Sequence, residues 1–267
     1  MTDTTSTGND SVLSQDEDRV CVITINRPNA LNAMNNNVFA GIADALVAAA
    51  ASTHSAVAVI TGSGRAFSAG QDLSELQNSN DGDAAGYQFP RMLHQLTNFN
   101  KPLIAAVNGL GVGIGMTLLA HCDLVFMADT ARLKTPFPQL GLAPEAGSSS
   151  TFIQRMGWQN AAYTLLSGRW FSAKECLEMG LVWRLTEPLN LMDETLAVAG
   201  ELAANPIPSL VATKELLLAS GRAQDAWAAH QREVEAYASL LGAPANKEAL
   251  AAFLEKQPAE FAKIPGL

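Results

Sequence analysis

The residue best suited to chemistry in this sequence is one carboxylate, Glu145. It lies in the segment 134–152, between a proline and a run of small residues that opens a predicted helix. A lone acid beside a stiff turn has room to exchange protons with a bound substrate. The apolar side chains of Phe137, Leu142 and Phe152 would raise the pKa of its carboxyl towards useful basicity. The other interpretation of Glu145 is an acid in the first turn of a helix, stabilised by the helix dipole.

Two loops of small residues precede Glu145, and each lies between a predicted strand and the start of a predicted helix. The first spans 62–70, and the second, 109–115, has glycine at every second position. Such loops expose unpaired backbone N–H groups, and two of these converging on one oxygen atom form an oxyanion hole. The simpler interpretation is that the glycines permit tight turns and close packing of helices on the sheet. Because both loops precede a lone acid, we favour the interpretation as an oxyanion hole.

Other motifs that carry chemistry do not occur in the sequence. There is no Gly-x-Gly-x-x-Gly, no Gly-x-x-x-x-Gly-Lys-Ser/Thr and no Gly-x-Ser-x-Gly, so nucleotide cradles and a nucleophile elbow are not expected. The histidines lack metal-ligand spacing and predict no metal site; they are His54, His94, His121 and His230. The three cysteines, Cys21, Cys122 and Cys176, are far apart and predict buried thiols in a reducing compartment.

Composition indicates a folded, acidic protein. Hydrophobic residues make up 48% of the 267 residues, and the net charge of −9 argues against a general nucleic-acid surface. No apolar run reaches the ~20 residues that a membrane span needs. The start of the chain lacks the features of a signal peptide, and its last three residues, Pro-Gly-Leu, are not a peroxisomal address. We therefore expect a cytoplasmic protein with no nucleic-acid or membrane partner.

The elements that must position these residues alternate between strands and helices. Strands are predicted at 20–25, 57–61, 103–107, 123–127 and 181–185, and early helices at 36–51, 90–99 and 116–120, with a short one from about residue 72. This alternation is typical of an α/β layer architecture, and a strand-strand-helix unit recurs before residue 130. Later helices are predicted at 159–166, 173–179, 189–204, 208–220, 223–241 and 247–256.

Two motifs resemble the signatures of the crotonase (enoyl-CoA hydratase/isomerase) superfamily. The segment 67–73, Phe-Ser-Ala-Gly-Gln-Asp-Leu, is similar to the first signature and follows Gly-Ser-Gly-Arg-Ala. The segment 101–109, Lys-Pro-Leu-Ile-Ala-Ala-Val-Asn-Gly, runs into Gly-Ile-Gly at 113–115 and resembles the second. The early loop 26–33 and the tail 252–256 also resemble the family. The resemblance covers nearly the whole chain after residue 18.

The resemblance implies a fold and an assembly. The fold would be an α/β fold of the crotonase (ClpP-like) type, a spiral of repeated strand-strand-helix units with a helical C-terminal trimerisation region. We expect a disordered tail over 1–18, the spiral core over 19–200 and the helical region over 201–267. The expected assembly is a homotrimer, or a hexamer formed as a dimer of trimers.

The resemblance also implies a site for an acyl-CoA thioester. The oxyanion donors would be the backbone N–H groups of Gln71 and Ile114, and no cofactor is expected beyond the coenzyme A of the substrate itself. The residues expected to bind CoA or substrate are Arg27, Ala30, Leu31, Ala69, Gly70, Asp72, Leu73, Tyr237 and Lys256. Phe137 and Leu142 are expected to line the acyl pocket. For Lys256 an exposed lysine on a helix is an equally good interpretation.

The implied reaction depends on which carboxylates are present. By the resemblance, a hydratase uses two glutamates, and these would fall at Thr117 and Phe137, which cannot transfer a proton as a carboxylate would. Glu145 follows Phe137 by eight residues and resembles the glutamate that acts alone in the peroxisomal type of Δ3,Δ2-enoyl-CoA isomerase. The implied activity is conversion of 3-enoyl-CoA to 2-trans-enoyl-CoA, a step of fatty acid β-oxidation. Thr117 is interpreted as a packing residue.

Two alternatives remain open. The chain could be an enoyl-CoA hydratase, or catalyse another crotonase reaction, with Glu145 and a second group. It could also be an acyl-CoA-binding protein whose site has lost its chemistry. The sequence does not define the acyl chain length or distinguish a trimer from a hexamer.

Overall fold

Two β-sheets form the centre of the molecule, which in this computed structural model is described over residues 10–72, 86–255 and 257–264. The larger sheet has the order β1-β2-β3-β5-β7-β10. Its strands are β1 (Val12–Glu17), β2 (Val20–Ile25), β3 (Val57–Gly62), β5 (Leu103–Val107), β7 (Leu124–Ala128) and β10 (Arg184–Thr186). All neighbours in it are parallel except β1 and β2.

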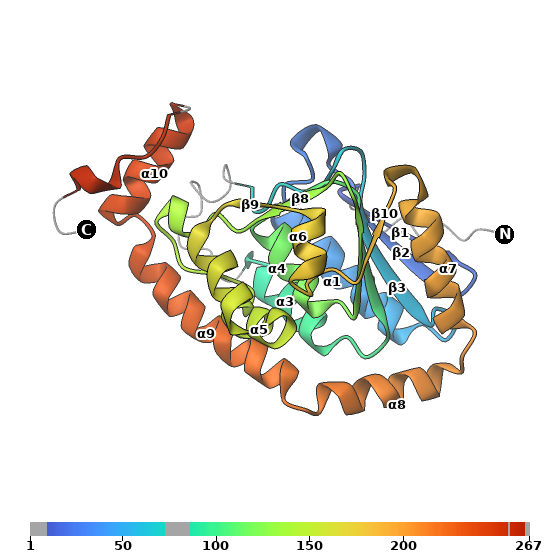
Figure 1. Ribbon diagram of the computed structural model, residues 1–267. Helices are drawn as coiled ribbons and strands as arrows, with labels where there is room; N and C mark the ends of the chain where they lie inside the picture. The colour runs from blue at the N-terminus through green and yellow to red at the C-terminus, as the bar shows by residue number, and fades with distance from the viewer. Residues whose placement is uncertain (1–9, 73–85, 256, 265–267) are drawn as a thin grey trace.

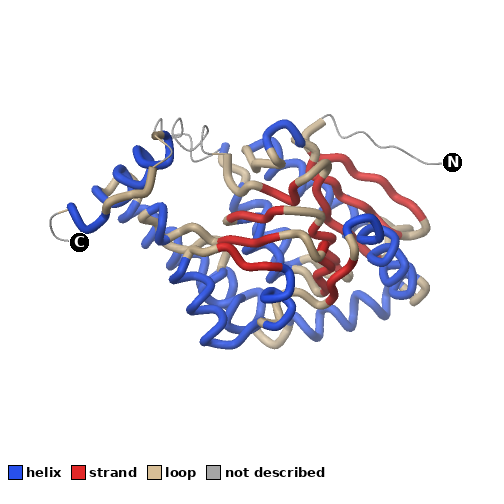
Figure 2. Tube along the Cα trace, turned by 45° about the horizontal axis from the view of Figure 1, so that its top comes forward, coloured by secondary structure: helices blue, strands red, loops and turns tan. Residues whose placement is uncertain are grey.

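The smaller sheet has the order β4-β6-β8-β9 and lies beside the larger one (Figure 2). Its strands are β4 (Ala66–Ser68), β6 (Leu110–Val112), β8 (Arg132–Lys134) and β9 (Trp170–Ser172), of which β9 alone pairs antiparallel. Strand β3 leads into β4, β5 into β6 and β7 into β8, so each turn of the chain adds one strand to each sheet. This is the spiral architecture that the resemblance implied.

Helices cover both faces of the larger sheet. Helix α1 (Asn36–Ala51) packs on β1, β2 and β3, while α7 (Leu191–Ala203) packs across β2, β3, β5 and β7 (Figure 1). Strand β3 has the uninterrupted apolar sequence Val-Ala-Val-Ile, which is typical of a strand covered on both faces. Each of these side chains is at most 1% exposed. The buried Lys101 holds the end of α1, since its Nζ donates to the carbonyls of Ala49, Ser52 and Ser55 at 2.7–2.8 Å.

The C-terminal helices run along the outside of this body (Figure 1). They are α8 (Ile207–Leu218), α9 (Arg222–Leu240), α10 (Pro244–Leu254) and a short η6 (Phe261–Lys263). Helix α9 packs on α5 (Ser148–Ser167) and α3 (Phe89–Asn98), and α10 packs on η4 (Pro138–Leu140). The remaining helices are η1 (Pro28–Ala30), α4 (Ile114–Thr117), η3 (Leu118–His121), α6 (Ala173–Glu178) and η5 (Pro188–Asn190). Of the helices described, none is long and apolar enough to cross a bilayer.

Several predicted elements need correction. Part of the expected disordered tail is strand β1, whose sequence Val-Leu-Ser-Gln-Asp-Glu buries only Val12 and is stabilised by its ladder with β2. The predicted helix 116–120 is divided between α4 and η3. Helix α5 begins at Ser148, in the run of small residues that was expected to open a helix, and therefore eleven residues before the predicted segment 159–166; it is kinked at Gly157, where φ is 76°. The short helix predicted from residue 72 falls on 73–85, outside the described residues.

Candidate active site

Glu145 lies in the turn that leads into α5 and faces the start of α4. Its Oε1 accepts a hydrogen bond of 3.2 Å from Thr117 Oγ1. The same oxygen lies 4.0 Å from the position that a Cβ on Gly113 would occupy. The fold therefore brings the predicted proton-transfer residue beside the second glycine loop. Thr117 is fully buried, as expected of a packing residue, but it also contacts the acid, a role that the sequence did not indicate.

The environment of Glu145 favours the protonated form of its carboxyl. The residue is half-buried, and burial raises its pKa to about 8; the negative charge of Glu233 adds to the rise, and the hydrogen bond from Thr117 opposes it. A raised pKa is what the apolar neighbours in the sequence predicted. A carboxyl with a pKa near the working pH can both remove and return a proton.

The backbone after Glu145 is held in an unusual conformation. Ala146 and Gly147 both have left-handed φ angles, 60° and 70°. For Ala146 this conformation costs on the order of 1 kcal/mol, so surrounding contacts must hold it. One such contact is His121, whose Nε2 hydrogen-bonds to the Ala146 carbonyl at 2.8 Å. Burial lowers the pKa of His121 to about 4, so its imidazole is neutral at physiological pH.

A second carboxylate fixes this turn from α9. Glu233 is buried and accepts hydrogen bonds from the backbone N–H of Gly147 at 2.6 Å, the N–H of Ser149 at 2.8 Å and the hydroxyl of Ser149 at 2.6 Å. It therefore satisfies N–H groups that the first turn of α5 would leave without partners. A Cβ at Gly147 would lie 2.5 Å from the Ala226 carbonyl, so glycine allows α9 to approach this closely. Sequence reasoning missed Glu233.

The two glycine loops lie against each other because β4 and β6 are paired, with Ser68 opposite Gly111. A Cβ at Gly70, where φ is 93°, would lie 2.8 Å from the Val112 carbonyl. The backbone N–H groups of Gln71 and Ile114 donate to no other described residue, whereas those of Gly70 and Gly113 donate to Ser68 Oγ and the Lys134 carbonyl. The fold thus brings together the loops that carry both predicted oxyanion donors, and within the described ranges neither donor has a partner.

Several of the residues predicted to bind CoA lie in or against the early loop. Arg27 Nη1 donates to Asp72 Oδ2 at 2.9 Å and to the Ala33 carbonyl at 2.5 Å. The N–H of Ala69 donates to the carbonyl of Leu31, which follows Ala30 at the end of η1. The loop is fixed from within by Asn32, a buried residue that the sequence reasoning missed and whose amide group contacts Arg27 N and the carbonyls of Ser63 and Ala66. Leu73 and Lys256 lie outside the described residues.

Tyr237 lies closer to the acid than the sequence indicated. It follows Glu233 by one helical turn on α9 and therefore shares its face. Burial raises the pKa of Tyr237 to about 12, and the charge of Glu145 contributes, so the two side chains are within electrostatic range.

The predicted acyl-pocket residues Phe137 and Leu142 are 5% and 9% exposed. They are joined by a 2.8 Å hydrogen bond from the Leu142 N–H to the Phe137 carbonyl.

The sequence predicted no metal site and three buried thiols. The described residues contain no group of three or more His, Cys, Asp or Glu side chains that could hold a metal ion. All three cysteines are buried free thiols, as expected.

Comparison with known proteins identifies relatives along most of the chain. The model of the protein family described as "Enoyl-CoA hydratase/isomerase" matches residues 15–263. This range includes both loops, Glu145 and α9. The 2,3-dehydroadipyl-CoA hydratase of Escherichia coli (strain K12) is 34% identical over 246 residues, 92% of this chain and 96% of that protein.

Two solved structures share the fold. An enoyl-CoA hydratase/isomerase from Pseudoalteromonas atlantica T6c has a TM-score of 0.89 at 33% identity and covers 94% of this chain and 99% of its own. An enoyl-CoA hydratase from Mycobacterium marinum has a TM-score of 0.74 at 47% identity and covers 78% of this chain and 99% of its own. The similarity thus extends from the sequence to the arrangement of both sheets.

Proposed function

The chain belongs to the enoyl-CoA hydratase/isomerase (crotonase) family, and from that membership we propose that Glu145 transfers protons on a bound acyl-CoA thioester. The specific reaction that we propose is isomerisation of a 3-enoyl-CoA to the 2-trans-enoyl-CoA. The observation that carries the proposal is one carboxyl, with a pKa raised to about 8, placed beside the second glycine loop.

In the proposed reaction the thioester carbonyl accepts hydrogen bonds from the N–H groups of Gln71 and Ile114. Each such donor stabilises the developing oxyanion by roughly 3–4 kcal/mol when water is excluded. The polarised carbonyl acidifies the C2 protons, and Glu145 removes one to leave a dienolate whose charge rests on the carbonyl oxygen. The Glu145 carboxyl then returns the proton to C4, which moves the double bond into conjugation with the carbonyl.

The residues around Glu145 support a reaction with one acid. A 1,3-shift on one face of the substrate needs a single group that acts as base and then as acid. The positions that the resemblance assigns to the two glutamates of a hydratase hold Thr117 and Phe137. The other acid that influences the pKa of Glu145 is Glu233, and its carboxylate is engaged by Gly147 and Ser149. It is therefore not free to act on substrate.

Hydration of a 2-enoyl-CoA is the second candidate, and the names of the relatives favour it. The Escherichia coli relative and the Mycobacterium marinum structure are both named as hydratases. In this chain Glu145 would activate the water and then protonate C2, with Thr117 Oγ1, 3.2 Å from its Oε1, as the nearest hydroxyl to position that water.

The two reactions are separated by assaying isomerisation of 3-hexenoyl-CoA beside hydration of crotonyl-CoA. We expect isomerisation to exceed hydration, and Glu145→Gln to lose roughly 10²–10⁴-fold in kcat for isomerisation while acyl-CoA binding persists. Glu235→Gln, an exposed acid on α9, is the matched control and should keep full activity. Faster hydration than isomerisation in the unmodified protein would establish the second candidate. Binding of acyl-CoA without exchange of the C2 protons in deuterated water would instead show a binding protein.

We also propose that the active form is a trimer or a hexamer. Large apolar side chains remain exposed on the outer helices, where a second copy could cover them; they include Trp158, Leu166, Leu216 and Leu217. Such exposed apolar area is typical of an interface between subunits. Sedimentation of the purified protein measures the assembly directly.

A further inference from the structure

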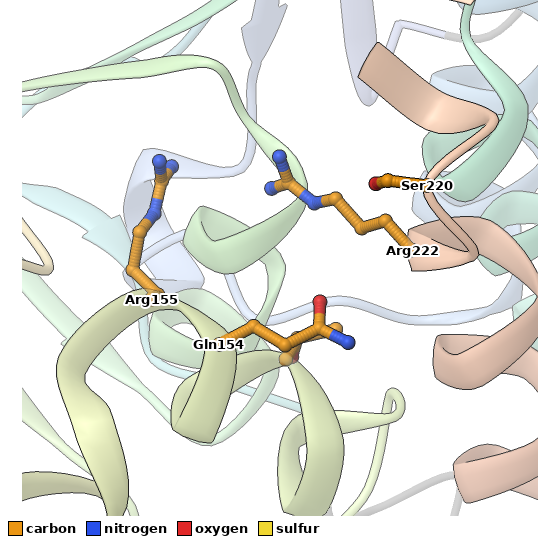
Figure 3. A pocket seen from close by; sticks show the side chains of 5 residues that line it. Gln154, Arg155, Ser220 and Arg222 are labelled. Atoms are coloured by element: carbon orange, nitrogen blue, oxygen red, sulfur yellow. The ribbon is translucent and has the colours of Figure 1, made fainter. Parts of the chain in front are cut away.

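A polar cavity lies where α5 meets the junction of α8 and α9, and its lining includes none of the residues proposed to act on substrate. Its volume is about 400 Å³, and it is lined by Thr151, Gln154, Arg155, Ser220 and Arg222. Figure 3 shows the two arginine side chains entering from opposite sides, Arg155 from α5 and Arg222 from α9, with the Gln154 amide between and below them.

The two guanidinium groups donate hydrogen bonds to different backbone carbonyls in and just after η3. Arg155 donates to the carbonyls of Leu119, Cys122 and Asp123, and Arg222 donates to that of Ala120. Within the described part of the chain neither arginine forms an ion pair with an acid. The positive charge of Arg222 helps to lower the pKa of Arg155, so the two cations lie close enough to repel each other.

The acids nearby are already engaged. Asp123 pairs with Lys214, with both carboxylate oxygens 2.5 Å from Nζ, and it accepts a 2.8 Å hydrogen bond from the Leu103 N–H. Asp225 accepts a hydrogen bond of 3.3 Å from the neutral Gln154 amide and keeps its negative charge, so it offsets one of the two arginines. Burial keeps the neighbouring His121 neutral by lowering its pKa to about 4. The cavity therefore keeps an excess of positive charge in a chain whose net charge is −9.

Two buried polar atoms at the cavity have no hydrogen-bond partner among the described residues. One is Oγ1 of Thr151, a residue only 2% exposed, and the other is Nε of Arg155. Both atoms are closed off from solvent, so an anion in the cavity cannot reach them; the donors that it can meet there are the Arg222 guanidinium and the Gln154 amide. The hydroxyl of Ser220 is not one of these donors, because it donates to the Leu217 carbonyl at 2.9 Å.

We propose that this cavity binds a phosphate or the phosphoryl group of a small metabolite. A tetrahedral oxyanion offers acceptor oxygens in several directions, which suits donors that converge from α5 and α9; a flat carboxylate offers two oxygens in one plane. The anion would accept hydrogen bonds from the Arg222 guanidinium and the Gln154 amide, and the positive charge of Arg155 would attract it. It would also join α5 to the first turn of α9, the helix that carries Glu233 to the catalytic turn.

The test is calorimetric titration of the full-length protein with inorganic phosphate, repeated with glycerol 3-phosphate and with chloride at equal ionic strength. We expect saturable binding of one phosphate per chain, a higher Tm in phosphate, and no comparable effect of chloride. Tighter binding of glycerol 3-phosphate than of inorganic phosphate would identify a phosphorylated metabolite as the source, and the reverse would identify free phosphate.

Variants separate this site from general charge effects. Arg222→Gln should raise the Kd for phosphate by about tenfold or more, because a charge-assisted donor is lost. Arg232→Gln removes the same charge from an exposed position on α9 and should leave the Kd unchanged. Thr151→Val keeps the shape of the side chain and removes an unpaired hydroxyl that is closed off from the cavity, so it should leave the phosphate Kd unchanged and the Tm without phosphate equal or higher.

The proposal is overturned if phosphate and chloride act alike, or if Arg222→Gln and Arg232→Gln weaken binding equally. It is also overturned if phosphate does not bind and Arg222→Gln instead reduces self-association in sedimentation. In that case the arginines would pair with a carboxylate from a second copy of the chain.

Discussion

Glu233, on the long helix α9, accepts a hydrogen bond of 2.6 Å from the backbone N–H of Gly147, two residues after Glu145. This contact spans 86 positions of sequence and joins the C-terminal helices to the turn that presents the acid. It links three quantities that are usually separate: the conformation of the turn, the pKa of Glu145 and the docking of α9. Each can be measured.

The pH dependence of activity should report the raised pKa of Glu145. The base must be ionised in the free enzyme, and its pKa is raised from 4.5 to about 8. We expect kcat/KM to rise about tenfold per pH unit below pH 8 and to level off above it. A midpoint between 4 and 5 would show that Glu145 has an ordinary carboxyl and would contradict the assigned role.

Replacing Glu233 by Gln should lower that midpoint. The negative charge of Glu233 helps to raise the pKa of Glu145, so its removal favours ionisation at lower pH. Weaker hydrogen bonds to Gly147 and Ser149 should also cost about 1–3 kcal/mol of stability. Glu235→Gln on the exposed side of α9 is the control and should change neither quantity. A loss of stability without a shift of the pH midpoint would leave Glu233 with a structural role alone.

Replacing Thr117 by Val should move the midpoint in the opposite direction. The Thr117 hydroxyl donates to Glu145 Oε1 at 3.2 Å and lowers the pKa of the carboxyl. Valine has the same shape but cannot donate, so the pKa should rise further and activity at pH 7 should fall severalfold. The pH profile of Thr117→Val beside the unmodified enzyme checks this. An unchanged midpoint would mean that the hydrogen bond does not form in solution.

Replacing Glu145 by Gln should stabilise the protein at high pH. The folded-state pKa is raised, so the folded protein binds the proton more tightly, and stability falls as pH increases from 4.5 towards 8. A protein with the Glu145→Gln substitution lacks this loss, because the amide does not ionise. Urea unfolding should therefore give similar stabilities at pH 5 and a difference on the order of 4 kcal/mol in favour of Glu145→Gln at pH 9, since each pH unit between the two pKa values corresponds to about 1.4 kcal/mol. Equal stabilities at both values would show that the carboxyl ionises without cost in the fold.

Replacing Gly70 by Ala should impair catalysis more than folding. An added Cβ would lie 2.8 Å from the Val112 carbonyl and would push apart the loops that carry Gln71 and Ile114. Misplaced donors should lower kcat by roughly 10²-fold or more. Gly200→Ala is the matched control, because its Cβ meets nothing within 4 Å and alanine favours a helix. Full activity in Gly70→Ala would argue against the proposed oxyanion hole.

Long, periodic segments of this fold could be predicted from the sequence. Strands β2 and β5 and helix α1 have the predicted bounds, because runs of five or more residues show their apolar pattern. Strands β4, β6, β8 and β9 have three residues each and show no period, so their pairing depends on the neighbours that the spiral brings to them. The second sheet was therefore predicted only through the resemblance.

The sequence could indicate a candidate site where chemistry depends on residue type, and it missed the parts that depend on contacts between distant residues. Glu145 could be recognised as a lone acid among apolar neighbours. Thr117, 28 positions away from it, gave no sign of its hydrogen bond to the acid. Glu233 lies on a helix with many charged and alanine residues, where an acid normally faces solvent. Its burial follows from the packing of α9 on α5, which no local pattern encodes.

The position of Glu233 has a consequence for the order in which the candidate site is assembled during synthesis. Both sheets and α5 are complete by residue 186, but the carboxylate that fixes the catalytic turn is added at residue 233. While α9 is still within the ribosome, Gly147 and Ser149 lack their partner and the left-handed turn at Ala146 has lost one of its restraints. The turn that presents Glu145 is therefore completed only after both sheets, when α9 has been made and packs on α5.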